Sequence, residues 1–479
     1  MDFSAVWPEI ILAGLGTLLL AADPFVRRPS GQRALAYVTL LGLVGAGAAA
    51  LALPRQGAVV LGGMIVLDGL TLFFRLLFVV AALLVILFSI DFIQARGKDL
   101  VEFLALLLFA TTGAMVLAAS ADVVDLWIGL ELLSVSSYVL AAFLRDEPRS
   151  HEAGLKYLLN GSLASAVLLF GLSLLYGLTG QTSLLGIAAG LGVALQTAYS
   201  GVVWLGLGLV LAGLAFKIAA APFHLWAPDA YEGAPTPVTG YLMVVAETAG
   251  FAAILRLVSV GMAPLAAEWG PWLAVLAAVT MTVGNVTALW QKNLKRLLAY
   301  SSVAQVGYIL AGVAVASRTG LGSTLFYLVA YLFTTLGCFA VVVALSVRGQ
   351  GDLVADYAGL GGRAPALAIL LTFFLASYVG VPVTAGFMGK LGLIGAAVNG
   401  HMAWLAVAIA VNSAVSIAYY WSVARTMWLD PAPAGERPIA SSGATGLSLA
   451  LSGLGCLFLG ILPQAFFALS GWAASATRR

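Results

Sequence analysis

Long apolar runs recur from one end of this chain to the other, and each is long enough to cross a lipid bilayer as a helix. A spanning helix needs about 20 mostly apolar residues. Because hydrocarbon offers no hydrogen bonds to peptide groups, an isolated spanning segment must be a helix. The runs lie at about 5–23, 33–52, 64–91, 102–119, 122–143, 153–178, 197–226, 234–260, 271–289, 294–316, 321–347, 366–396, 402–428 and 444–470.

The composition indicates a chain that lies almost wholly in the membrane. Hydrophobic residues fill 62% of its 479 positions and charged residues only 9%, whereas soluble domains have about 25% charged residues. The nearest thing to a linker is the stretch LTGQTSLLGIAAG after the sixth run. We therefore expect an all-α polytopic membrane protein with about fourteen transmembrane helices. Residues 1–479 form a single membrane domain in this interpretation, with no room for a soluble one.

Basic residues are shared unevenly between the connections that join the runs. The connections after odd-numbered runs carry Arg27, Arg28, Arg33, Arg96, Lys98, Arg145, Arg149, Lys292, Lys295, Arg296, Arg348, Arg363 and Arg437. The connections after even-numbered runs carry little beyond Arg55 and Arg318. Because basic loops stay on the cytoplasmic side, both termini are expected outside. That side is the periplasm if the source is bacterial and the chain lies in the cell inner (plasma) membrane.

The stretch from Leu214 to Thr239 places a lysine and a proline inside an apolar run. A lysine at the centre of a spanning helix costs roughly 2.5 to 3.5 kcal/mol, so Lys217 needs water or a partner. Pro222 has no N–H to give to the preceding turn, and a free carbonyl in hydrocarbon must be satisfied by protein or water. These features, with His224 close by, predict an interrupted helix that lines a hydrated cavity. The alternative is a lysine that snorkels to the surface over a purely structural kink.

Charged side chains inside the first six runs are rare enough that each needs an explanation. Asp68 and Arg75 are two helical turns apart, and we interpret them as local pairing. Glu131 has apolar neighbours on both sides, while Ser134 and Tyr138 continue a polar stripe on its helix face. A carboxylate at that depth is either protonated or paired with a cation, and such residues are functional by default. The alternative for Glu131 is a structural ion pair.

Two further ionisable residues complete the first half of the chain. Lys156 follows Glu152 at the favourable four-residue spacing, and it lies near enough to the boundary to snorkel. Glu247 is at mid-depth, and Arg256 points to the other side of the helix because nine residues make two and a half turns. Glu247 therefore needs another partner, for which Lys217 or water is the candidate.

The twelfth run repeats the pattern of the seventh. Gly380, Pro382 and Gly386 interrupt it, and Lys390 stands about one turn beyond. Two broken helices with buried charges, five runs apart, point to inverted repeats. We expect an N-terminal three-helix segment (1–100), a first five-helix repeat of runs four to eight (101–262), a second of runs nine to thirteen (270–428) and a C-terminal helix (429–479).

Several kinds of site are absent from the sequence. Cys338 and Cys456 lie in separate runs and form no ligand set for a metal. There is no phosphate-binding loop, HExxH, CxxC or nucleotide fingerprint. A net charge of +2 spread over loops argues against nucleic acid. We expect no cofactor and no metal on this chain.

Five stretches carry a family resemblance: AFKIAAAPFHLWAPDAYEGAPTPVT, WIGLELLSVSSYVL, QKNLKRLLAYSS, YLFTTLG and GVPVTAGFMGK. Together they resemble the antiporter-like membrane subunits of bacterial NADH-quinone oxidoreductase, or respiratory complex I, and most of all the N-type (ND2-type) family. The resemblance implies that quinone reduction elsewhere in the complex drives proton transfer through this chain. The partners would be the other membrane and peripheral subunits, which would hold the FMN, iron–sulfur clusters and quinone.

The resemblance also implies roles for individual residues. Glu131 would be the acid paired with Lys217, Lys156 an auxiliary lysine, and Lys390 the exit-side lysine. His224 would belong to the hydrated break.

Two positions depart from the family pattern. The family usually has a lysine where this chain has Glu247, and commonly a histidine where it has Gln305. A carboxylic acid at position 247 can still take part in a proton relay, whereas Gln305 can only orient water.

The sequence leaves two alternatives open. One is a subunit of an Mrp-type cation/proton antiporter, which uses related spans. The other is a scaffold that joins neighbouring subunits of the same complex and conducts nothing. The cost of inserting buried charges argues against the scaffold.

Overall fold

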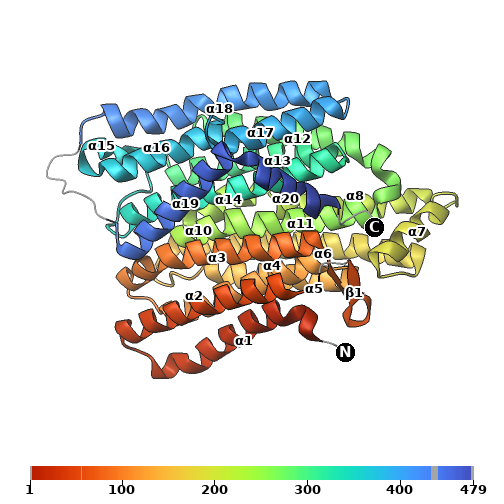
Figure 1. Ribbon diagram of the computed structural model, residues 1–479, viewed down its shortest axis with the longest axis horizontal. Coiled ribbons are helices and arrows are strands. Elements are labelled where there is room, and N and C mark those ends of the chain that lie inside the picture. Colours follow the sequence, from red (N-terminus) through yellow and green to blue (C-terminus); the bar gives the residue numbers. More distant parts are fainter. Residues whose placement is uncertain (1–2, 55–56, 433–440, 476–479) are drawn as a thin grey trace.

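The computed structural model describes residues 3–54, 57–432 and 441–475, which form a bundle of roughly parallel helices (Figure 1). Thirteen helical segments in these ranges are long and apolar enough to cross a membrane. One further crossing consists of two shorter helices, α16 (Pro365–Val379) and α17 (Ala385–Asn399). The prediction of an all-α polytopic chain with about fourteen crossings is therefore confirmed.

The N-terminal part contains three long helices and a small hairpin. Its elements are α1 (Trp7–Ala22), α2 (Pro29–Ala52), β1 (Ala58–Val60), β2 (Ile65–Leu67) and α3 (Gly69–Ala95). The next part contains α4 (Leu100–Ala119), α5 (Val123–Ala141), α6 (Pro148–Thr179), α7 (Leu184–Ala194), α8 (Ser200–Lys217), α9 (Trp226–Gly233), α10 (Thr236–Tyr241) and α11 (Glu247–Arg256). Two π-helical segments, Leu242–Ala246 and Leu257–Gly261, flank α11.

The remaining helices complete the bundle. They are α12 (Ala266–Ala288), α13 (Leu294–Ala314), α14 (Arg318–Ser346), α15 (Leu360–Arg363), α16 and α17 as above, α18 (Ala403–Leu429), α19 (Gly443–Ile461) and α20 (Pro463–Ser475). Short 3-10 helices occupy Phe3–Val6, Asp23–Phe25, Leu61–Gly63, Ala263–Leu265 and Val354–Tyr357.

The third crossing begins later than the sequence predicts. The predicted run starts at about residue 64, whereas residues 58–67 form the antiparallel hairpin of β1 and β2 and α3 starts at Gly69. The Asp68 carboxylate accepts the backbone N–H of Thr71 at 2.8 Å and so caps the helix. The predicted boundary is wrong because a short apolar strand and the first turn of an apolar helix have similar hydrophobicity.

Two other boundaries differ from the prediction. The stretch expected as a linker contains α7, which buries Ile187 and Leu191 and is capped by the Ser183 hydroxyl at 3.1 Å. The last run, predicted at 444–470, is two helices that meet at Pro463. A proline cannot donate to the preceding turn, so α19 ends there and α20 begins in a new direction.

Two buried ion pairs join α3 to distant parts of the chain. The Arg256 guanidinium donates to both Asp68 oxygens, at 2.5 and 2.8 Å, and Arg75 donates to Glu9 at 2.7 Å. The expected local pairing of Asp68 with Arg75 is therefore wrong. Asp68 lies before the first turn of α3, so the two side chains do not share the helix face that their spacing implied. Each takes a partner from another helix, because a buried charge needs one.

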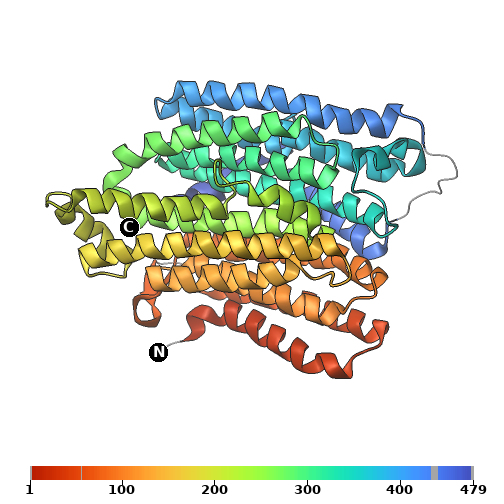
Figure 2. The same cartoon turned by 180° about the vertical axis from the view of Figure 1, so that it is seen from behind.

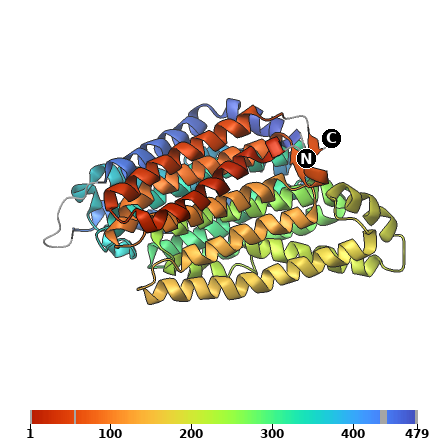
Figure 3. The same ribbon diagram turned by 90° about the horizontal axis from the view of Figure 1, so that it is seen from below.

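The arrangement of the helices leaves a buried centre and exposed flanks. α1 lies along one long edge of the bundle and α18 along the opposite edge, with α11 and α14 between them (Figures 1 and 2). Figure 3 shows α6 and α19 on opposite faces. In an 18-residue apolar stretch of each helix, 100% of the residues are buried in α13 and 94% in α14, whereas only 28% are buried in α6. The wide outer face of α6 is therefore left for lipid or for a neighbouring protein.

The start of α1 and the end of α20 lie at the same end of the bundle (Figure 1). Gly69, at the start of α3, contacts Trp472 and Ala473 of α20, and Ala5 packs in one cluster with Leu67. The position of α1's start and α20's end on the same side of the bundle agrees with an even number of crossings. Arg55 and Arg437, which entered the orientation argument, lie outside the described residues.

Candidate functional site

The interruption expected near Pro222 is present. α8 ends at Lys217, and α9 begins at Trp226 after an irregular stretch. The carbonyls that the break frees find donors: the Ala220 N–H binds the Ala215 oxygen at 2.8 Å, and the Trp226 indole binds the Phe216 oxygen at 3.0 Å. The break can therefore persist inside the bundle, because its free carbonyls are satisfied by protein groups.

Lys217 stands at the last position of α8, where it is 4% exposed. Its amine donates to the Ser134 hydroxyl of α5 at 2.8 Å. A small cavity of about 10 Å³ lies beside it, lined by Ser134, Ser165 and Tyr138 among others. This is on the order of the space that one water molecule needs. Lys217 thus faces a small pocket between α5, α6 and α8 that contains three hydroxyl groups, and does not snorkel to the surface.

Glu131 is near this pocket without touching the lysine. Its carboxylate accepts a hydrogen bond from the Ser165 hydroxyl, and no ion pair joins it to Lys217 within the described ranges. The two ionisable groups are each held by one serine of the same pocket. Glu131 is half-buried, and its neighbours Leu132 and Val135 are exposed.

A network of ion pairs surrounds α9, close to the ends of α6 and α13. Lys156 pairs with Glu152 at 2.7 Å and with Asp229 at 2.9 Å. Arg296 pairs with Asp229 at 2.7 Å and with Glu232 at 3.0 Å. Sequence reasoning placed Lys156 here but not its partner Asp229, and took Arg296 only as a membrane-boundary anchor. The one available signal was the three-residue spacing of Asp229 and Glu232 in a chain with few charges.

His224 and Lys295 complete the surroundings of this network. His224 is 7% exposed, and its ring lies edge-on to Tyr300 of α13, with centroids 6.3 Å apart. The Lys295 amine, 5% exposed, donates to the Ala234 carbonyl at 2.8 Å. That carbonyl follows the last residue of α9, so Lys295 places a positive charge at the negative end of this helix.

Glu247 is 1% exposed and takes its hydrogen bonds from hydroxyl groups. Oε1 accepts from Tyr231 at 2.9 Å and from Ser302 at 3.0 Å, and Oε2 accepts from Tyr331 at 3.0 Å. These donors come from α9, α13 and α14, so the Glu247 carboxylate is hydrogen-bonded to three helices. Lys217, which was expected as a partner beside water, is not among these donors.

The second interruption is also present, and the Lys390 amine binds the carbonyls at the end of the helix that precedes it. α16 ends at Val379, Gly380 has a φ of 91°, and α17 begins at Ala385. The Lys390 amine, 5% exposed, donates to the Tyr378 carbonyl at 2.7 Å and to the Val379 carbonyl at 3.1 Å. It also lies 4.4 Å from the centroid of the Tyr308 ring. A lysine that binds the last carbonyls of a helix is favoured by the helix dipole.

Gln305 of α13 lies in a group of tyrosines that extends to Lys390. Gln305 accepts from the Tyr327 hydroxyl at 2.5 Å and donates to the Tyr420 hydroxyl at 3.5 Å. The Tyr420 ring stacks on Tyr378 at 5.5 Å, and the Tyr378 carbonyl receives Lys390. The middle of α13 therefore reaches the second break through hydrogen bonds of neutral groups and one ring-stacking contact.

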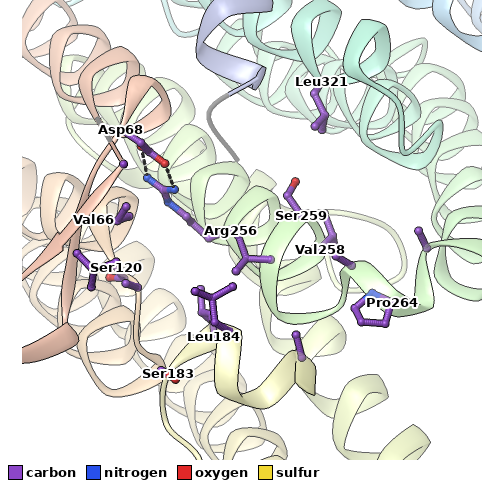
Figure 4. Close-up of a pocket in the computed structure, with 18 of the residues that line it drawn as sticks. Val66, Asp68, Ser120, Ser183, Leu184, Arg256, Val258, Ser259, Pro264 and Leu321 are labelled. Atoms are coloured by element: carbon purple, nitrogen blue, oxygen red, sulfur yellow. Dashed lines mark hydrogen bonds and ion pairs between the residues drawn. The ribbon is translucent and has the colours of Figure 1, made fainter. Parts of the chain in front are cut away.

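A larger cavity of about 1110 Å³ lies at the end of the bundle where α1 starts and α20 ends (Figure 4). The Asp68–Arg256 pair lines it, together with Ser120, Ser183 and Leu184. Arg256 also donates to Thr71 and to the Ala118 carbonyl, so its guanidinium is occupied. This cavity holds none of the predicted site residues. In the described ranges no group of three His, Cys, Asp or Glu side chains could hold a metal ion.

Gly386 of α17 lies directly against α16, so a substitution there tests how closely the two helices pack at the second break. A Cβ added to Gly386 would fall 1.8 Å from the Ser377 carbonyl oxygen. Gly386→Ala should therefore push α17 away from α16 and cost about 1–3 kcal/mol or more. Gly395→Ala on the same helix is the matched control, because nothing lies within 4 Å of its Cβ position. We expect a lower thermal midpoint for the purified protein with Gly386→Ala only; equal midpoints for the two variants would contradict this.

Comparisons with known proteins agree with this architecture. Residues 120–416 match the family described as NADH:quinone oxidoreductase/Mrp antiporter, TM. The chain is 42% identical over 466 residues to NADH-quinone oxidoreductase subunit N of Trichlorobacter lovleyi, with 97% of this chain and 95% of the relative covered. It is 43% identical over 465 residues to NADH-quinone oxidoreductase subunit N of Heliobacterium modesticaldum, with 97% of each covered. Among solved structures it is similar to a chain of respiratory complex I from Thermus thermophilus with bound aureothin, with a TM-score of 0.78, 33% identity and coverage of 96% and 98%.

Proposed function

Because the chain belongs to the subunit N family of NADH-quinone oxidoreductase, within the NADH:quinone oxidoreductase/Mrp antiporter membrane proteins, we propose that protons cross it along a row of buried side chains. The chain is a membrane subunit of this multi-subunit complex, respiratory complex I. The complex as a whole is an oxidoreductase that translocates protons. The proposed row is Glu131, Lys217, Glu247 and Lys390.

One observation carries the proposal. Lys217, Glu247 and Lys390 are each 5% exposed or less, and among the described residues none of them forms an ion pair. A lysine at such depth costs about 2.5 to 3.5 kcal/mol to insert. A scaffold would gain nothing from three such groups, whereas a relay needs groups that can gain and lose a proton in place.

The first half of the row lies around the broken seventh crossing. A proton on Lys217 has the Ser134 hydroxyl as its next contact, and Glu131 is held at the same pocket through Ser165. At about 4 Å and an effective dielectric near 20, a carboxylate and an ammonium attract by roughly 4 kcal/mol. We propose that Glu131 stabilises the charge on Lys217 when the two groups approach, and that separation releases the proton. Lys156 and His224 would supply protons from the α9 end of the break.

The second half of the row runs from Glu247 to Lys390. Glu247 takes the position at which a basic residue is usual in the family, and its three hydroxyl donors suit a carboxylate that changes its protonation. Lys390 would receive the proton at the end of α16. Gln305 would orient the Tyr327 and Tyr420 hydroxyls between them.

The exposed side of α5 is the proposed site of contact with a neighbouring subunit. Glu131 is half-buried in this chain, with Leu132 and Val135 exposed beside it. A carboxylate at the level of the lipid is expensive unless protein or water covers it. Another membrane subunit of the complex would supply that cover.

The remaining parts of the proposal concern place and cofactors. We propose that the chain lies in the cell inner (plasma) membrane, and the distribution of basic residues supports an orientation with both termini in the periplasm. We propose that the chain holds no cofactor or metal itself, and that FMN, iron–sulfur clusters and quinone are bound by other subunits. The antiporter alternative is less well supported, because relatives at 42% and 43% identity are named as NADH-quinone oxidoreductase subunit N.

A single purification tests the assignment to the complex. The chain is tagged at its C-terminus, solubilised in mild detergent and isolated on the tag. Flavin absorbance, iron–sulfur signals and NADH-dependent quinone reduction are expected to copurify with it. Recovery of the chain with none of these, or with antiporter subunits in their place, would overturn the assignment.

A further inference from the structure

The short helix α9 (Trp226–Gly233) connects the ion-pair network to Glu247. Two of its side chains, Asp229 and Glu232, pair with Lys156 of α6 and Arg296 of α13. A third, Tyr231, is fully buried and donates its hydroxyl to Glu247 at 2.9 Å. Within eight residues, one helix thus contacts both the ion-pair network and Glu247 of the proposed relay.

This helix is held as a rigid unit. The Trp226 ring stacks on Tyr157 of α6 with centroids 4.5 Å apart, and it lies edge-on to Tyr231 at 5.5 Å. At the other end, a Cβ on Gly233 would fall 2.4 Å from the Arg149 carbonyl oxygen, so α9 and α6 are in close contact. A displacement of Asp229 or Glu232 would therefore be expected to move Tyr231 with the rest of the helix.

The two cations that hold α9 differ in one property. Arg296 remains charged at any physiological pH, because guanidinium does not lose its proton in proteins. Lys156 gains and loses a proton in the proposed relay, and its partners Glu152 and Asp229 both favour its charged form. Asp229 is shared between the two cations, with Glu232 on the Arg296 side and Lys295 bound to the Ala234 carbonyl. When Lys156 is neutral, Arg296 of α13 is the one of these two cations that still attracts the Asp229 carboxylate.

We propose that α9 couples the charge of Lys156 to the hydrogen bonding of Glu247, with Tyr231 as the positioning residue and Arg296 as the fixed anchor. This inference rests on the proposed relay roles of Glu247 and Lys156. With Lys156 charged, α9 is held from both sides and Tyr231 completes three donors on the carboxylate. With Lys156 neutral, α9 is drawn toward α13 and the Tyr231 contact changes.

The first test is a cycle of variants at positions 231 and 247. It uses the assembled complex in proteoliposomes and measures protons moved per NADH oxidised. Tyr231→Phe keeps the ring and removes the donor, and one hydrogen bond to a charged group corresponds to about a 10-fold to 100-fold change in an equilibrium. We expect a clear loss of proton transfer with Tyr231→Phe, a loss with Glu247→Gln, and no further loss in the double variant. Tyr357→Phe is the matched control, because the buried Tyr357 hydroxyl binds only the Gly351 carbonyl in a distant loop.

The outcomes separate this inference from the function on which it rests. Full proton transfer with Glu247→Gln would refute the relay role of Glu247. Loss with Glu247→Gln but none with Tyr231→Phe would refute the coupling alone, and so would losses that simply add in the double variant. If Tyr231→Phe failed to assemble, Arg296→Lys would serve instead, since it keeps the charge but cannot bridge Asp229 and Glu232 with the same planar geometry.

The second test concerns Lys156. Lys156→Gln removes the variable charge, and we expect it to lower proton transfer in the otherwise unchanged chain. In a Tyr231→Phe background the same substitution should have little added effect, because the link to Glu247 is already cut. Equal effects of Lys156→Gln in both backgrounds would show that Lys156 acts without α9.

Discussion

Lys217→Ala is expected to stop proton transfer through this chain while the complex still assembles. Among the described residues the Lys217 amine donates to Ser134 alone, and the lysine is buried where the crossing breaks. Removing a group that donates and accepts a proton costs about 10²–10⁴-fold in rate. The measurement is the initial rate of acidification per NADH oxidised in proteoliposomes.

Lys217→Arg makes the same test more specific. Arginine keeps the positive charge and can still donate to Ser134, but it does not release its proton. A relay therefore predicts that both variants fail, whereas a structural charge predicts that arginine restores function. Lys98→Ala is the control, because Lys98 lies in the loop between α3 and α4 and pairs with Asp146 of the loop between α5 and α6. Normal proton transfer with Lys217→Arg would exclude the relay role of this residue.

The second large effect is expected at Lys390, where stability and proton transfer can be separated. Lys390→Met removes the donor to the Tyr378 and Val379 carbonyls. A buried polar group left without a partner costs about 1–3 kcal/mol. We expect Lys390→Met to lower both the thermal midpoint of the complex and its proton transfer.

Lys390→Arg should restore only one of these two properties. The guanidinium can bind the same carbonyls and so recover the thermal midpoint, but it cannot pass on a proton. Thermal unfolding and proton transfer per NADH are measured on the same preparations. If arginine recovered both, Lys390 would be a helix cap and not a member of the relay.

The positions of the two breaks could be predicted from the sequence because they depend on local chemistry. Pro222 and Gly380 limit the backbone wherever they stand, and a lysine such as Lys217 or Lys390 is costly in any apolar run. The polar stripe from Glu131 to Ser134 was visible for the same reason, since residues three apart share a helix face. In the structure Ser134 is the partner of Lys217.

The partners of the buried charges could not be predicted in the same way. Asp68 binds Arg256, which is 188 residues away, and Asp229 binds Arg296, which is 67 residues away. Local spacing suggested Arg75 for Asp68 and a boundary anchor for Arg296. Glu247 was expected to use Lys217 or water, and its donors in the structure are three hydroxyls from three helices. Neutral tyrosines and serines are common in membrane helices, so the sequence did not show which of them reach Glu247.

The sequence by itself determined that this chain crosses the membrane about fourteen times and where two crossings break. It also determined which charged side chains have a high cost of insertion into the membrane. These properties follow from hydrophobicity, backbone restriction and insertion cost, each of which acts within a few residues. Only the tertiary structure decided which of those side chains meet and through which neutral groups. That choice depends on how the helices pack, because packing alone brings α9 between α6 and α13 and aims Tyr231 at Glu247.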